Sequence, residues 1–144
     1  MGLDWKYQDK DFTEEDIKDY YGFVYIITNL ANNKKYIGKK FFYSLKTKQV
    51  NGKKKKMKVF SDWKTYYGSS DSLKKDVVQF GKENFSREIL HLCTSKGECG
   101  YLEAKEQFAR EVMESDDFYN IWIMCRVRRS HIKEYNARNA EGFS

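Results

Sequence analysis

Two tyrosines beside a pair of lysines carry the strongest chemical signal in this sequence. Tyr25 lies in an apolar stretch, and Tyr36 opens the run Tyr-Ile-Gly-Lys-Lys, which ends at Lys40. Alternate residues of a strand share a face, so Tyr36 and Gly38 would point one way and Lys39 the other. The glycine would leave room for a nucleic-acid backbone, and a nearby lysine would lower the pKa of the tyrosine and make it a better base. Alone, the segment also fits two ordinary sheet tyrosines with solvated lysines.

These residues need a scaffold, and the surrounding pattern predicts one. Residues 22–28 are β-branched and aromatic, which is typical of a buried strand, and residues 34–42 would return as its hairpin partner across an asparagine-rich loop. A helix is expected over 70–80, followed by a third strand over 85–92. A long helix with an apolar stripe is expected between Tyr101 and Met113. We therefore expect an α/β (α+β) fold, with a small three-stranded antiparallel sheet flanked by helices.

Three further segments complete the expected organisation. Residues 1–20 are polar and contain a capping-box start for a short helix, and residues 128–144 form a basic, polar tail. Between the hairpin and the first helix, residues 44–58 hold seven lysines: Lys46, Lys48, Lys53, Lys54, Lys55, Lys56 and Lys58. Like charges repel, so this insertion is expected to be a mobile loop or an extended ribbon. The folded domain would cover residues 21–127.

Composition narrows the class of protein. The chain has 144 residues with a net charge of +6, 17% aromatic residues and no proline, which suits one packed domain and excludes a wholly disordered chain. No apolar run is long enough to span a membrane, and no secretory signal is visible. Three cysteines without a Cys-x-x-Cys pair, Cys93, Cys99 and Cys125, favour reduced thiols in a cytoplasmic compartment.

The order of these elements resembles the GIY-YIG nuclease family. The triplet at 23–25 and the run at 36–39 resemble the two halves of its signature, the first in degraded form. The later helix, strand, glutamate-bearing helix and Tyr-Asn pair at 119–120 follow in the family's order. Longer runs are similar to the phage-encoded homing-type branch, and they lie at residues 36–42, 62–70 and 82–85.

The resemblance implies hydrolysis of DNA phosphodiester bonds with one divalent ion, Mg²⁺ or Mn²⁺, in a bacterial host cytoplasm. Tyr36 would be the base, assisted by Tyr25 and Lys39, and Asn120 would position the phosphate or the active-site network. One carboxylate can hold an ion that keeps most of its water shell and stabilises the leaving oxygen. Neither a membrane nor a small-molecule cofactor is expected, and cutting both strands would require a dimer or two successive events.

Two glutamates could hold the metal ion. Glu103 matches the first acid of the helix motif in the phage branch and stands four positions before Gln107 on the same helix face. Glu106 lies 14 residues before Asn120, a spacing that the family also permits. We favour Glu103 and keep Glu106 as the alternative. His91 and His131 match no expected site and are interpreted as structural or surface residues.

The sequence departs from the family at one catalytic position. Many members carry an arginine about ten residues after the second signature tyrosine, where this chain has Lys46. Lys40 or Lys64 could supply the missing charge, although lysine lacks the bidentate fork of arginine. The departure keeps open a non-catalytic nucleic-acid-binding module on the same fold. A protein-interaction domain that uses its aromatic residues is a third interpretation.

Charge is concentrated directly after the second signature strand. Residues 34–66 hold 12 lysines and one aspartate, a net charge of +11. DNA contact is therefore expected from the lysines of the insertion, which include Lys46 at the arginine position, and from five further residues around it and in the tail. Those five are Trp63, Tyr66, Arg126, Arg128 and Arg129. Trp63 and Tyr66 could instead anchor the insertion onto the sheet.

Overall fold

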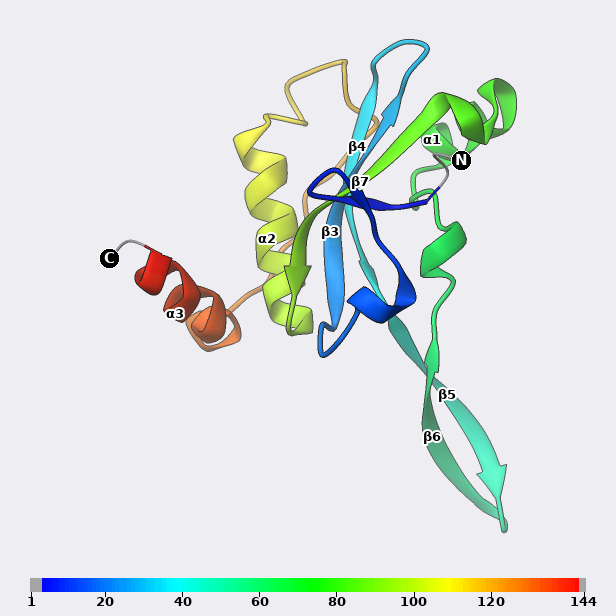
Figure 1. The fold of residues 1–144 in the computed structure, drawn as a ribbon, viewed down its shortest axis with the longest axis vertical. Helices are drawn as coiled ribbons and strands as arrows, with labels where there is room; N and C mark the ends of the chain where they lie inside the picture. The colour runs from blue at the N-terminus through cyan, green and yellow to red at the C-terminus, as the bar shows by residue number, and fades with distance from the viewer. Residues whose placement is uncertain (1–3, 143–144) are drawn as a thin grey trace.

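The computed structural model describes residues 4–142 as a mixed sheet, helices packed against it, and a separate two-stranded ribbon (Figure 1). The sheet order is β2-β1-β7-β3-β4, in which only the β1–β7 pair is parallel. Its strands are β1 (Lys6–Tyr7), β2 (Lys10–Asp11), β3 (Gly22–Asn29), β4 (Lys35–Phe41) and β7 (Phe85–Cys93). The α+β class is as predicted, but the sheet has five strands where three were expected. The two additional strands, β1 and β2, have two residues each and are too short to show an alternating pattern in the sequence.

The interior strand β3, between β7 and β4, is buried on both faces. Phe23, Tyr25 and Ile27 join one apolar cluster, whereas Val24 and Ile26 join a second cluster on the opposite face. A strand that packs on both sides reads as a continuous apolar run, and this is why residues 22–28 show no alternation. The sheet therefore lies between two apolar clusters, one on each of its faces.

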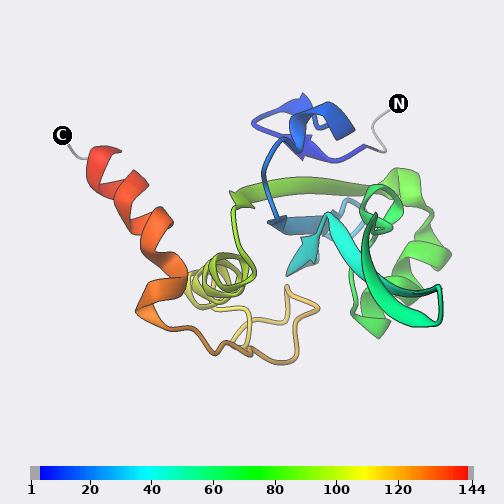
Figure 2. The same cartoon turned by 90° about the horizontal axis from the view of Figure 1, so that it is seen from below.

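The first cluster is covered by the N-terminal segment, by η2 (Trp63–Thr65) and by α1 (Asp71–Phe80). Figure 2 shows the N-terminal segment on one side of the sheet and α2 on the other. Trp5 is buried, and its indole N–H donates a 2.7 Å hydrogen bond to the carbonyl of Trp63. Phe12 and Ile17 are also buried. The segment expected to be a polar lead-in, which includes η1 (Glu14–Asp16), thus supplies large side chains to the core.

The second cluster is covered by α2 (Lys96–Ala109), which packs Leu102 against the sheet. This helix begins before the predicted range and ends earlier, at Ala109, and Glu111 adopts a left-handed backbone (φ 54°) beyond its end. The residues expected to be a polar tail form η4 (Arg129–Ile132) and α3 (Lys133–Gly142). Arg138 of α3 contacts the buried carboxylate of Glu98 on α2 at 2.5 Å. The C-terminal helix is therefore docked on α2.

The lysine-rich insertion is an antiparallel ribbon of β5 (Tyr43–Val50) and β6 (Lys53–Phe60). Of the two predicted forms, the extended one is present. Its turn residues Asn51 and Gly52 both have positive φ, as a tight hairpin turn of this kind requires. The Tyr43 and Phe60 rings stack at the base with centroids 5.0 Å apart. The ribbon points away from the sheet, so its lysines are exposed (Figure 1).

The short η3 (Lys82–Asn84) leads into β7 and completes the elements. Cys93, Cys99 and Cys125 are free thiols. Across the described range, no helix combines the length and the hydrophobicity that crossing a bilayer demands.

Gly38 sets the distance between the two signature tyrosines. A Cβ atom at this position would lie 2.4 Å from the hydroxyl oxygen of Tyr25 and 2.9 Å from the Tyr36 ring. The space that glycine was predicted to leave for a nucleic-acid backbone is therefore filled by the phenol of Tyr25. The glycine lets one buried ring lie across β4.

Gly38→Ala should lower the free energy of unfolding by about 2 kcal/mol, because the added methyl group overpacks the Tyr25 contact. Urea denaturation followed by tryptophan fluorescence would measure the change. Gly100→Ala is the matched control, since its Cβ would meet nothing closer than 4.0 Å in the middle of α2. That variant should gain about 0.5–1 kcal/mol. Equal stability changes in both variants would contradict the packing argument.

Candidate active site

The candidate site lies along the open edge of β4. Within residues 4–142, no strand of the sheet pairs with this edge, and a short stretch of chain before residue 120 covers it instead. The Lys35 amide donates to the carbonyl of Asp117 at 2.8 Å, and the Tyr119 amide donates to the carbonyl of Lys35 at 2.7 Å. The hydroxyl of Tyr119 donates a 2.6 Å hydrogen bond to the carboxylate of Asp76 on α1, which anchors Tyr119 to that helix.

Asn120 continues this covering ladder with its side chain. Its Oδ1 accepts the Ile37 amide at 3.0 Å, and its Nδ2 donates to the Ile37 carbonyl at 2.8 Å. The side-chain amide therefore satisfies the backbone groups of a buried residue in the way that a neighbouring strand would. Asn120 was predicted to position a phosphate or the active-site network, and both of its amide atoms are engaged with β4.

A cleft of about 450 Å³ opens where the two faces of the sheet meet at this edge. Tyr36 reaches it from the face covered by α1, and Lys39 reaches it from the face covered by α2. Glu103 of α2 and the 120–122 segment complete the wall. The polar and charged lining is Tyr36, Lys39, Ser69, Ser70, Asp71, Ser72, Glu103, Gln107 and Asn120. An edge strand can bring residues of opposite faces into one cleft, whereas an interior strand could not.

Tyr36 is partly buried, and its hydroxyl lies 3.0 Å from the Ser69 hydroxyl. Burial raises the pKa of Tyr36, and the Glu103 carboxylate raises it further, against a lowering effect of the Ser69 hydrogen bond. The predicted lowering of this pKa by a lysine is therefore wrong. The ammonium groups of Lys39 and Lys40 are paired with the carboxylates of Glu103 and Asp62. Because the pKa of Tyr36 is raised, its resting form is the neutral phenol.

Lys39 and Glu103 form an ion pair inside the cleft, with Nζ 3.0 Å from Oε1. The Glu103 side chain is only 13% exposed. Burial raises its pKa, and the attraction and hydrogen bond of Lys39 offset only part of that effect. The carboxylate is thus short of solvation and would gain from a second cation.

Glu106 lies one turn further along α2 and does not line the cleft. Its carboxylate contacts the imidazole of His91 at 3.3 Å and the guanidinium of Arg110 at 3.0 Å. Burial acts to raise the pKa of Glu106, but the hydrogen bonds from His91 and Arg110 lower it overall. This carboxylate already has two partners.

The remaining predicted catalytic residues lie outside the cleft. Tyr25 is fully buried, and burial raises its pKa well above the ordinary value. Lys40 pairs with Asp62 at 2.6 Å and lies over the Tyr66 ring. Lys64 lies 3.6 Å from Glu14, and the neighbouring Trp63 is buried in the core. Trp63 therefore anchors the ribbon base, the second of its two predicted roles.

Across residues 4–142, Lys39 is the one cationic side chain that lines this cleft. Lys46, at the position of the family arginine, is exposed on β5 rather than carried on a helix. Arg87 is buried elsewhere, where it donates to the carbonyls of Lys64 and Tyr66 at 3.0 and 2.8 Å. It supports the segment after the ribbon.

Several residues of the cleft have no site role in the sequence analysis, among them Ser69, Gln107 and Trp122. Ser69 belongs to the Gly-Ser-Ser run at 68–70, for which the sequence predicts a helix start and a part of the family resemblance but no site role. Gln107 shares a helix face with Glu103, which was noted without a role being given. Trp122 is 65% exposed and lines the cleft. The sequence signal for it was a tryptophan in a short apolar segment, and its exposure in the structure is typical of a binding surface.

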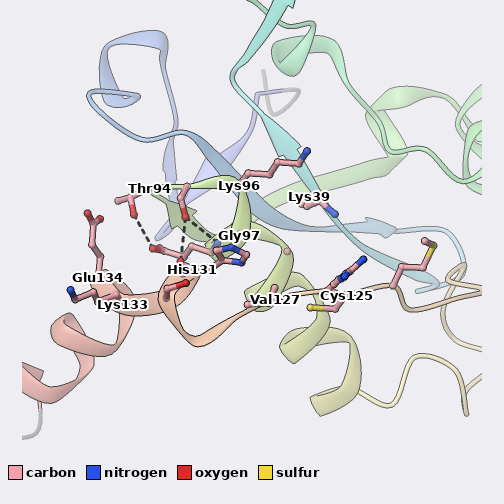
Figure 3. A pocket seen from close by; sticks show the side chains of 15 residues that line it. Lys39, Thr94, Lys96, Gly97, Cys125, Val127, His131, Lys133 and Glu134 are labelled. Atoms are coloured by element: carbon pink, nitrogen blue, oxygen red, sulfur yellow. Dashed lines mark hydrogen bonds between the residues drawn. The ribbon is translucent and has the colours of Figure 1, made fainter.

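A second hollow of about 730 Å³ adjoins the cleft and shares Lys39 and Met124 with it. In Figure 3, His131 and Glu134 gather toward one end of this hollow, and Lys39 and Cys125 lie toward the other. Its cationic lining residues are Lys39, Lys96, Arg126 and Lys133. Of the tail arginines expected to contact DNA, Arg126 lines this hollow, and Arg128 and Arg129 are exposed beside it.

Comparison with known proteins yields a family and a phage relative. The sequence model of the family described as "Putative endonuclease segE, GIY-YIG domain" matches residues 5–123. The chain is 33% identical over 101 residues to "Putative endonuclease segE" of Enterobacteria phage T4. The alignment covers 70% of this chain and 40% of that protein, so the chain matches less than half of the relative. No solved structure matches.

Glu103→Gln should leave the protein at least as stable as the wild type at pH 7 in the absence of metal. Because burial raises the pKa of Glu103 above its ordinary 4.5, the folded wild type loses stability as pH rises from 4.5 through the raised value. Glutamine does not titrate, so the variant's advantage in Tm should be largest at pH 7 and shrink at pH 4.

Differential scanning fluorimetry at both pH values measures this trend. Glu106→Gln is the matched control with the opposite sign, because the pKa of Glu106 is lowered in the folded state. That variant should lose stability at pH 7 and recover relative to the wild type at pH 4. The same trend in both variants would contradict the assignment of their environments.

Proposed function

This chain belongs to the segE-type GIY-YIG family, and from that membership we propose that it is a metal-dependent DNA endonuclease or nickase of the phage homing type. The observation that carries the proposal is the cleft that joins Tyr36, Lys39 and Glu103 at the edge of β4. A phenol, an ammonium group and a carboxylate are the groups that hydrolysis of a phosphate diester needs close together. Its site of action would be the cytoplasm of a bacterial host.

The proposed chemistry assigns one role to each side chain. In its phenolate form Tyr36 accepts the proton of the attacking water and becomes the neutral phenol, and Ser69, whose hydroxyl lies 3.0 Å away, holds the Tyr36 oxygen in place. Lys39 offsets the negative charge that builds on the phosphate in the transition state. Because the pKa of Tyr36 is raised, the phenolate fraction is small at neutral pH, and the rate would rise toward alkaline pH.

Glu103 is the proposed ligand of one Mg²⁺ or Mn²⁺ ion. It presents a hard oxygen donor that is mostly buried yet lines an open cleft. Among the described residues, no three His, Cys, Asp or Glu side chains are grouped as a metal cage, which suits an ion that keeps most of its water. When bound, the ion would polarise the scissile phosphate and stabilise the leaving oxygen.

DNA would reach this site along two basic surfaces. The hollow beside the cleft carries Lys96, Arg126 and Lys133 and shares Lys39 with the cleft. The second surface is the ribbon, where Lys48 stands directly opposite Lys55. Opposed like charges destabilise a two-stranded ribbon in water, and an anion between them removes that cost. A β-ribbon also fits the major groove of DNA.

A non-catalytic nucleic-acid-binding module is the second candidate. The observation that favours it is the absence of an arginine from the cleft in the described part of the chain, where Lys39 is already paired with Glu103. Such a module would bind DNA with a strong salt dependence. It would not cut DNA, whichever divalent metal is added.

Supercoiled plasmid incubated with the protein and Mg²⁺ should be converted to nicked or linear DNA. Glu103→Gln should reduce the rate by about three orders of magnitude or more, because several kcal/mol of charge stabilisation depend on the metal. Tyr36→Phe should reduce it by about 10²- to 10⁴-fold, because the base is lost. Gel densitometry under single-turnover conditions measures both rates.

Glu106→Gln is the control for this experiment and should cut at the wild-type rate. If Glu106→Gln is inactive and Glu103→Gln is active, the metal ligand is Glu106. If both variants cut normally, the proposed site is wrong. A wild-type protein that binds DNA but cuts with neither Mg²⁺ nor Mn²⁺ would establish the binding module instead.

The double variant Lys48→Gln/Lys55→Gln should bind DNA with a weaker salt dependence. Each lost phosphate contact reduces the slope of log K against log[salt] by about 0.9, so the pair should reduce it by about 2. Fluorescence anisotropy with a labelled duplex at several salt concentrations gives the slope. The control Lys74→Gln/Lys75→Gln removes the same charge from exposed positions on α1. An equal loss in both would show that net charge, not the ribbon, is responsible.

A further inference from the structure

Gln107 contains a buried polar atom that nothing in the described structure satisfies. The residue is 4% exposed and lines the catalytic cleft. Its Oε1 has no hydrogen-bond partner among the described residues. A buried acceptor without a donor costs about 1–3 kcal/mol, and native proteins keep such groups mainly where a ligand, water or ion completes them.

The orientation of this amide follows from its other contact. The Nε2 of Gln107 donates to the Ile37 carbonyl at 3.1 Å. A carbonyl can only accept, so exchanging the two amide atoms would place two oxygens against each other. The same Ile37 carbonyl accepts the Asn120 amide at 2.8 Å. Held in this way, Gln107 keeps Oε1 as its free acceptor.

Gln107 stands one helical turn after Glu103 on the same face of α2. Both line one cleft, and both offer a hard oxygen: a carboxylate short of solvation and an amide carbonyl without a donor. Mg²⁺ and Mn²⁺ favour oxygen donors, and Mg²⁺ retains several waters whose hydrogens need acceptors. One hydrated divalent cation would give the Glu103 carboxylate a positive partner and would give the Gln107 Oε1 a water molecule as hydrogen-bond donor.

We propose that Gln107 is a positioning residue of the metal site, whose Oε1 accepts a hydrogen bond from a water molecule of the cation held by Glu103. The inference rests on the proposed metal-dependent nuclease. Two protein oxygens from consecutive turns of α2 would then hold the cation, the Glu103 carboxylate directly and the Gln107 Oε1 through the water molecule. The Ile37 carbonyl then links the metal site to the backbone of β4, between Tyr36 and Lys39.

Metal binding to the full-length chain tests this without reference to cleavage. Free Mn²⁺ is measured by electron paramagnetic resonance during a titration of the wild type, Gln107→Met and Gln107→Glu. Loss of one hydrogen bond to a charged group should weaken Mn²⁺ binding by about tenfold in Gln107→Met. A second carboxylate should tighten it by about tenfold in Gln107→Glu. The metal-free Tm of Gln107→Met should change little, because the variant removes the unsatisfied acceptor together with one donor to the Ile37 carbonyl, and Asn120 still donates to that carbonyl.

Glu106→Gln is the matched control, since Glu106 neighbours Gln107 on α2 but does not line the cleft; its Mn²⁺ affinity should equal that of the wild type. Wild-type affinity in Gln107→Met would overturn the inference and leave the proposed function standing. A lowered Tm with unchanged affinity would mark Gln107 as purely structural. If Gln107→Met does not fold, unchanged affinity in Gln107→Glu overturns the inference. If the wild type binds no Mn²⁺, the proposed metal site fails together with it.

Discussion

The arrangement of the candidate site depends on how the backbone of Ile37 is satisfied. Ile37 is completely buried on an edge strand, where a polar backbone group without a partner would be costly. The side-chain amides of Asn120 and Gln107 provide the partners. These three hydrogen bonds hold the 117–120 segment and α2 at the edge of β4. Tyr36 and Lys39 flank this point, so the contacts that complete the fold also assemble the cleft.

The same burial shapes the chemistry of the cleft. Glu103 and Tyr36 are withdrawn from water, and burial raises the pKa of both. Burial of a carboxylate costs free energy, and it would strengthen the attraction of Glu103 to the proposed cation, a common exchange of stability for function. Lys39 provides partial compensation without saturating the carboxylate. Glu106 illustrates the contrast, because His91 and Arg110 already neutralise it.

Charge is divided between structure and proposed binding in a similar way. Lys40 is tied to Asp62 and to the Tyr66 ring at the base of the ribbon. The lysines of the ribbon itself extend away from the domain, with Lys48 opposite Lys55. A turn built on Asn51 and Gly52, both at positive φ, makes the hairpin possible despite this repulsion. Lysines close to the sheet stabilise the fold, and distant ones remain free for a polyanion.

The sequence by itself determined the family, the α+β class and the elements that carry Tyr36, Glu103 and Asn120, because local propensity and residue order are written along the chain. The family resemblance was confirmed by comparison with known proteins. Which carboxylate faces the cleft, what fills the space beside Gly38, and that Trp63 is buried were decided by tertiary structure. Each depends on contacts between segments distant in sequence, which no local pattern encodes. The role proposed for Gln107 likewise depends on the packing of α2 against β4, which brings its side chain to the Ile37 carbonyl and into the cleft.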